Sequence, residues 1–151
     1  IAVETLYQDV VVAVAAPKAA VARKRRLEWL DLADCPWILP PPESSARRRI
    51  DDEARQLGLP LPKELVETGS FLAMLMLLRE RDCVCLFPEH LAKYCEAALI
   101  VKVLPLPPIH MGSPIGIARL EGRRSRPAIA LFMECLREAS KLTRSGSSSS
   151  R

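Results

Sequence analysis

Two short polar segments carry residue types that could bind a small acidic or polar molecule. One follows a triple proline and the other follows a Val-Glu-Thr strand end, and each leads into a run with helical spacing. Hydroxyl groups and free backbone N–H groups at a helix start favour an anion such as a carboxylate, and a glycine lets the backbone approach a ligand closely. The ligand-binding candidates in these segments are Pro41, Pro42, Glu43, Ser44, Ser45, Thr68, Gly69 and Ser70.

The same residue types also have a purely structural explanation. Serine and threonine are common helix N-caps, so Ser44, Ser45 and Ser70 could act only as caps and Thr68 only as a strand end. On residue types alone, capping is the favoured interpretation. A ligand role therefore needs support from outside these two segments.

Catalytic and metal chemistry find little support in the sequence. His90 and His110 are the only histidines, no nucleophile–base arrangement can be named, and the GxSxG, P-loop and GxGxxG motifs are absent. Cys83 and Cys85 would place two sulfurs on one face of a strand, but two ligands are too few for a zinc site. We therefore expect no enzymatic activity, no metal and no cofactor.

Composition indicates a soluble domain that acts in a reducing compartment. The five cysteines have no framework spacing, which predicts free, mostly buried thiols in the cytoplasm. The net charge is only +4, and acidic residues follow the basic clusters at 23–26 and 47–49, so we interpret these clusters as solvated helix faces and not as a nucleic-acid surface. Charged residues or prolines interrupt every apolar run, which argues against a membrane partner.

Strand and helix patterns alternate along the chain. Apolar and β-branched runs predict strands over residues 9–15, 37–39, 64–68, 84–87, 99–106 and 115–120. Periodic and capping patterns predict helices over residues 27–33, 45–57, 70–81, 89–97 and 127–141. This order predicts an α/β fold with a largely parallel sheet and helices on its faces.

Six segments, in order, resemble the effector-binding domain of LysR-type transcriptional regulators, over about residues 4–140. They contain DLADCPWILPPP, GLPLP, VETGS, CLFPEHLA, LPL and SRPAIALF, at residues 31–42, 58–62, 66–70, 85–92, 104–106 and 125–132. The amino-acid sequence PWILPPP is similar to the corresponding segment in a subgroup that includes galactose-binding-protein and protocatechuate-pathway regulators.

The resemblance implies a periplasmic-binding-protein-like (type II) fold, in which two α/β lobes are joined by two crossover strands and bind an effector between them. It implies a crossover strand and first-lobe remnant at 1–17, a complete second lobe at 18–106, a return crossover with a first-lobe strand and helix at 107–144, and a disordered tail at 145–151. The first lobe would be truncated. Because the sequence begins at Ile1, DNA would be bound only through an absent N-terminal domain.

The implied partners are a small organic acid or sugar-like effector and a second copy of the chain. The helix predicted at 70–81 is apolar on nearly all sides, which fits either burial within its lobe or an interface. LysR-type effector domains dimerise side by side through such elements, so we expect a homodimer or a higher homo-oligomer. The alternative function is a solute-binding protein of a transport system with the same lobe fold, which an upstream signal peptide in place of a winged helix-turn-helix would reveal.

Overall fold

Strand β1 (Ala2–Ala15) is shared by both parts of the structure, a computed structural model that describes residues 1–60, 62–120, 122 and 126–147. In its second half, Val12 and Val14 belong to one hydrophobic core, and Ala13 and Ala15 belong to another. Successive strand residues point to opposite faces of a sheet, so this stretch is covered on both sides. The predicted strand is confirmed, but it begins at Ala2 and not at residue 9.

The chain divides into two compact units, residues 10–111 and residues 1–9 with the described part of 112–151. The other strands are β2 (Trp37–Leu39), β3 (Leu65–Glu67), β4 (Val84–Pro88), β5 (Lys102–Val103) and β6 (Ile109–Arg119). In the larger unit the strand order is β3-β2-β4-β1-β5, and β6 pairs with β1. Strand β2 is parallel to β3 and β4, whereas β1 is antiparallel to β4 and β5. The α/β fold is thus confirmed, but the sheet is mixed and not largely parallel, because β1 runs opposite to both of these neighbours.

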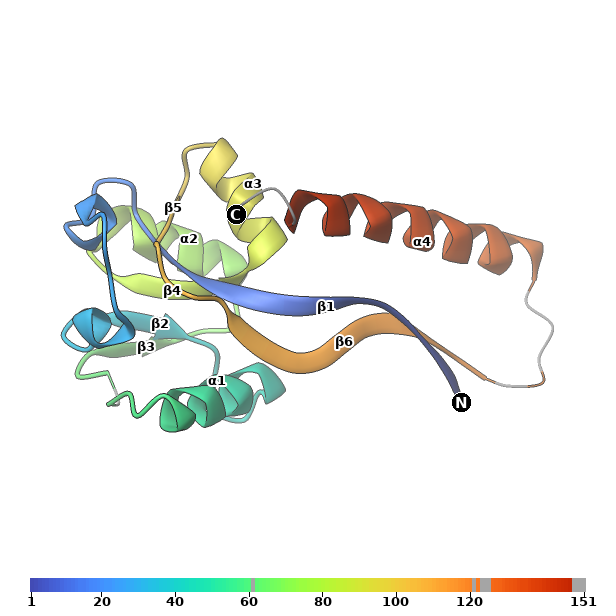
Figure 1. Cartoon of the computed structure of the whole chain (residues 1–151), viewed down its shortest axis with the longest axis horizontal. Coiled ribbons are helices and arrows are strands. Elements are labelled where there is room, and N and C mark those ends of the chain that lie inside the picture. The colour runs from blue at the N-terminus through green and yellow to red at the C-terminus, as the bar shows by residue number, and fades with distance from the viewer. Residues whose placement is uncertain (61, 121, 123–125, 148–151) are drawn as a thin grey trace. The chain divides into compact units, whose positions relative to one another are not determined.

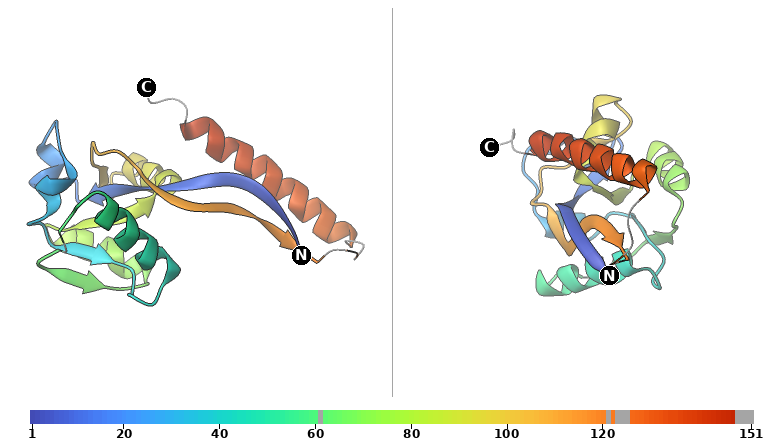
Figure 2. Two further views of the ribbon diagram at one scale, coloured as in Figure 1. Left: turned by 60° about the horizontal axis from the view of Figure 1, so that its bottom comes forward. Right: turned by 90° about the vertical axis from the view of Figure 1, so that its right-hand side faces the viewer.

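Helices cover both faces of the sheet in the larger unit. The helical elements of this unit are η1 (Val21–Arg23), η2 (Trp29–Leu32), α1 (Ser45–Gln56), α2 (Phe71–Glu80) and α3 (Glu89–Ala97), and helix α4 (Pro127–Ser147) belongs to the smaller unit. Leu78 of α2 and Cys95 of α3 share a core with Val14, while Val21 and Leu32 of the two 3-10 helices pack on the opposite face. Figure 1 shows α1 on the other side of the sheet from α2 and α3, and Figure 2 shows α1 in front of it.

Besides β1, three more predicted elements differ from the structure in type or in extent. The helix expected at 27–33 is only the short 3-10 helix η2, because Pro36 follows closely and disfavours a continuing helix. The strand expected at 99–106 is reduced to β5, since Leu99 has a positive φ of 57° at the end of α3 and Pro105 has no N–H to donate. The last predicted strand begins at Ile109 and not at residue 115.

Helix α4 extends beyond the end predicted for it. Residues 145–147, which were expected to start a disordered tail, are helical. The rest of that tail, residues 148–151, lies outside the described residues. Within the described part, no helix is both long and apolar enough to cross a bilayer.

The smaller unit contains the first half of β1, the second half of β6, and α4. Gly116 lies so close to β1 that a Cβ atom there would come within 2.4 Å of the Glu4 carbonyl oxygen. The guanidinium of Arg137 on α4 donates two hydrogen bonds to the Glu4 carboxylate, at 2.6 and 2.7 Å. This bidentate pair fixes α4 to β1, and it lowers the pKa of Glu4, chiefly through the hydrogen bonds from Arg137.

We predict that backbone amides of the larger unit are better protected from hydrogen exchange than those of the smaller one. Strand β4 is hydrogen-bonded on both sides, whereas within residues 1–9 and 112–119 the described strands form only a two-stranded ribbon, which is marginal by itself. Exchange followed by mass spectrometry on peptides from both units tests this. Equal protection of the two strand pairs would contradict it.

Candidate functional site

The parallel pairing of β2 and β3 brings the two polar segments to one edge of the sheet. Leu39 pairs with Glu67, and the backbone N–H of Thr68 donates to the Leu39 carbonyl at 3.0 Å. Beyond these strand ends the segments stay close, because a Cβ atom on Gly69 would lie 3.8 Å from Cδ of Pro41. We call the surface formed by residues 40–45 and 68–70 the strand-end site.

Two serines of this site cap helices, as their residue type suggested. The Ser44 hydroxyl oxygen accepts a hydrogen bond from the Arg47 backbone N–H at 3.1 Å, and the Ser70 oxygen accepts one from Ala73 at 3.3 Å. Ser45 is the first residue of α1 and is exposed, so Ser44 is the cap of that helix.

Capping leaves the hydroxyl protons of these residues available. Thr68 Oγ1 also accepts a backbone hydrogen bond, from the Ser70 N–H at 3.1 Å. A hydroxyl has one donor besides its acceptor lone pairs, and in the described part of the chain the hydroxyls of Ser44, Thr68 and Ser70 act only as acceptors. Three O–H donors therefore remain near two helix N-termini, where the positive end of each helix dipole favours a ligand that accepts hydrogen bonds.

The remaining candidates shape the rim of the site. Pro41 is half-buried and its carbonyl accepts from the Ser44 N–H at 3.0 Å, which closes a turn before the helix. Pro42, Glu43 and Gly69 are exposed. All eight candidates thus lie on the two segments that the structure brings together, and their contact with a ligand stays a prediction.

Arg47 is the functional residue that the sequence analysis missed. It was assigned to a solvated basic face, but it is 7% exposed. Its guanidinium donates to the Pro40 carbonyl at 3.1 Å, to Glu67 at 2.8 Å and to Asp51 at 2.9 Å. Burial by itself would lower the pKa of Arg47, but the hydrogen bonds that Arg47 donates to the carboxylates of Glu67 and Asp51 outweigh burial and raise it. Arg47 thus links the first segment, the end of β3 and helix α1.

Helical spacing is the signal that could have revealed this role. Arg47, Ile50, Asp51 and Ala54 recur at intervals of three and four residues, which places them on one face of a helix. Ile50 marks that face as the buried one. Within the run of three arginines, only Arg47 shares the face with Ile50.

We predict that Arg47→Met destabilises the chain by about 1–3 kcal/mol, because it leaves Glu67 and Asp51 without their partner but both carboxylates are partly exposed to water. Urea unfolding followed by circular dichroism measures this. The matched control is Arg48→Met, since Arg48 is exposed on the same helix. If the two variants unfolded at the same urea concentration, Arg47 would not hold the segments together.

The sequence of this chain is similar to one protein family and to two curated transcriptional regulators. The family model described as the LysR substrate binding domain matches residues 1–141. GbpR of Azospirillum brasilense, an HTH-type transcriptional regulator, is 31% identical over 116 residues, which cover 77% of this chain and 34% of GbpR. GalR of Pseudomonas putida, another HTH-type transcriptional regulator, is 28% identical over 102 residues, which cover 68% of this chain and 26% of GalR.

Solved structures share the fold at low sequence identity. The effector domain of AmpR from Pseudomonas aeruginosa superposes with a TM-score of 0.70 and 19% identity, over 95% of this chain and 66% of that chain. The regulatory domain of CcmR from Synechocystis, in complex with 2-PG, gives a TM-score of 0.67 and 16% identity, over 93% and 67%. The effector-binding domain of QuiR, in complex with shikimate, gives 0.64 and 20%, over 92% and 66%.

These likenesses confirm the type II periplasmic-binding-protein-like fold that the sequence motifs implied. The chain spans about a third or less of the curated regulators and about two thirds of the solved effector domains. With a family match over residues 1–141 and regulators as its curated relatives, the chain belongs to the LysR substrate-binding domain family.

Proposed function

We propose that this domain senses a small molecule for a DNA-binding transcriptional regulator and that the strand-end site contacts that molecule. The observation that carries the proposal is the approach of Gly69 to Pro41, which brings two helix starts and three hydroxyl donors to one place. The curated relatives are regulators, which favours this function over solute transport. DNA would be contacted by another domain of the regulator, in the cytoplasm.

The chemistry of the site favours a small organic acid or a sugar-like effector. Both offer several oxygen acceptors to the O–H groups of Ser44, Thr68 and Ser70. The positive ends of α1 and α2 add a preference for a carboxylate. Related domains were solved with 2-PG and with shikimate, which supports a ligand of this size.

Sensing, and not catalysis, is the role that we assign to the site. The three hydroxyls accept hydrogen bonds from backbone N–H groups, and neither His90 nor His110 is part of the strand-end site. No hydrogen bond joins any of these hydroxyls to a carboxylate or an imidazole in the described part of the chain, as an activated nucleophile would require. Effector binding would act by shifting the population of two domain arrangements, because a ligand favours the state that it binds more tightly.

Helix α2 supports self-association. The sequence left open whether this apolar helix is buried or forms an interface. In the structure one side of the helix is buried and another side is exposed. Leu78 is buried in the core, whereas Leu72 is 67% and Met76 is 61% exposed. Leu99, which is 83% exposed, lines the same surface hollow as these two side chains. An apolar patch of this kind is typical of a protein interface, and we propose that a second copy of the chain covers it.

We predict that Thr68→Val and Ser44→Ala each weaken effector binding about three- to tenfold, the cost of one lost hydrogen bond. Isothermal titration of the chain with a panel of sugars and aromatic acids identifies the ligand, and the variants are then titrated with it. Thr5→Val, in an exposed part of β1, is the control. Unchanged affinity in both variants would show that the strand-end site does not bind the effector.

We also predict that the double substitution Leu72→Lys and Met76→Lys converts the dimer to a monomer in light scattering coupled to size-exclusion chromatography, because it places two like charges at the buried centre of the interface. The control is the pair Glu80→Lys and Arg81→Lys, at exposed positions near the end of α2. A wild-type chain that is monomeric at high concentration would contradict the proposed interface.

A further inference from the structure

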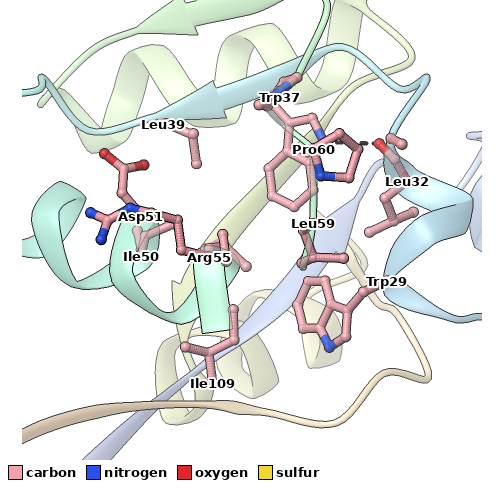
Figure 3. A pocket seen from close by; sticks show the side chains of 14 residues that line it. Trp29, Leu32, Trp37, Leu39, Ile50, Asp51, Arg55, Leu59, Pro60 and Ile109 are labelled. Carbon is pink, nitrogen blue, oxygen red and sulfur yellow. Dashed lines mark hydrogen bonds between the residues drawn. The ribbon is translucent and has the colours of Figure 1, made fainter. Parts of the chain in front are cut away.

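A pocket of about 300 Å³ lies in the larger unit and shares no residue with the strand-end site. Helix α1, the 3-10 helix η2 and the link after α1 surround it, and strands β2 and β4 contribute its floor (Figure 3). Its lining is formed mainly by apolar side chains, among them Trp29, Trp37, Leu39, Ile50, Leu59 and Ile109.

Three polar side chains around this pocket already have partners. The Trp37 indole N–H donates to the Leu32 carbonyl at 3.0 Å, the dashed contact in Figure 3. Asp51 is paired with Arg47 at 2.9 Å, and Arg55 is paired with Asp52 at 2.8 Å. Among the described residues, no buried side-chain nitrogen or oxygen lacks a hydrogen-bond partner. The pocket therefore offers a guest mainly apolar contact, and its two charged side chains are already paired.

We propose that this pocket is a second ligand site, which binds a neutral aromatic compound of one or two rings. Its volume is at the lower end of the range of small-molecule sites, and it equals the share of about ten water molecules in the liquid. A guest of this size would replace water that the apolar lining cannot hydrogen-bond.

An aromatic guest fits the tryptophan side chains of the pocket, and a neutral guest fits a lining whose charged side chains are already paired. Figure 3 shows the indole rings of Trp29 and Trp37 toward one end and the side chains of Leu39 and Ile50 toward the other. Aromatic pairs gain from stacked and edge-to-face contacts beyond the area that they bury. A charged guest would lose its hydration without gaining a free counter-charge, because Asp51 is paired with Arg47 and Arg55 is paired with Asp52.

The two tryptophans of the chain both line this pocket, so intrinsic fluorescence reports directly on its occupancy. We use 4-fluoroanisole as the neutral probe and follow both tryptophan emission and the fluorine NMR signal during titration of the chain. The expected result is a saturable change in both signals. The charged analogue 4-fluorobenzoate is expected to bind at least about tenfold more weakly.

A pocket-filling variant locates the site. Ala54 on α1 lines the pocket, so Ala54→Leu is expected to weaken probe binding at least about tenfold, whereas Ala97→Leu, at an exposed position on α3, leaves it unchanged. Circular dichroism verifies that each variant is folded. Should Ala54→Leu fail to fold, Trp29→Leu replaces it and is expected to weaken binding through loss of one wall.

A variant of the strand-end site tests whether the probe binds in the aromatic pocket or at the strand-end site. Thr68→Val is expected to leave probe binding unchanged, so failure of either site is seen independently of the other. No saturable change up to the solubility limit of the probe, equal affinity for 4-fluorobenzoate, or unchanged binding in a folded pocket variant would each overturn the proposal.

Discussion

The buried guanidinium of Arg47 holds the end of β2 against the end of β3. It donates to the Pro40 carbonyl just after β2 and to the carboxylate of Glu67, the last residue of β3. Arginine can do this because its planar group offers five donors and stays charged when it is buried. Asp51 takes up a further donor at the next helical turn. Both polar segments start from the ends of these two strands, so this side chain reinforces the arrangement that the pairing of β2 with β3 gives them.

The sheet order explains how two helix starts meet. Strands β2 and β3 are parallel neighbours, so the segments that follow them leave from the same edge. Helix α1 then lies on one face of the sheet, and α2 packs on the other (Figure 1). The N-termini of two helices on opposite faces of the sheet thereby lie near the same edge. Their two helix dipoles together favour a negatively charged ligand there more strongly than one dipole would.

Helix α1 takes part in both proposed sites. Its first turn carries the Ser44 cap and Arg47 at the strand-end site, and its inner face carries Ile50 and Ala54 at the aromatic pocket. Asp51 lies at the boundary, since it lines the pocket and also pairs with Arg47. Leu39 joins the two sites as well, because it lines the pocket and its carbonyl accepts a hydrogen bond from the Thr68 N–H. If both sites bind, any effect of one ligand on the other must be reciprocal.

The sequence by itself determined the features that depend on local pattern. Hydrophobic periodicity placed β2, β4, α2 and α3 close to their observed positions, because burial follows side-chain spacing. Gly58, which follows the helix predicted at 45–57, adopts the positive φ of 65° that is typical of a glycine at a helix end. The colinear motifs indicated the family, which the family model confirms over residues 1–141.

Tertiary structure alone decided what is brought together across long separations. The two polar segments are more than twenty residues apart in the chain, and only the pairing of β2 with β3 makes them neighbours. Arg47 looks like its neighbours Arg48 and Arg49 in composition, and its burial depends on where Glu67 and Pro40 lie. The pocket between Trp29 and Trp37 arises from packing of η2 and α1 over the sheet. Contacts of this kind depend on strand order and helix placement, which no local spacing encodes.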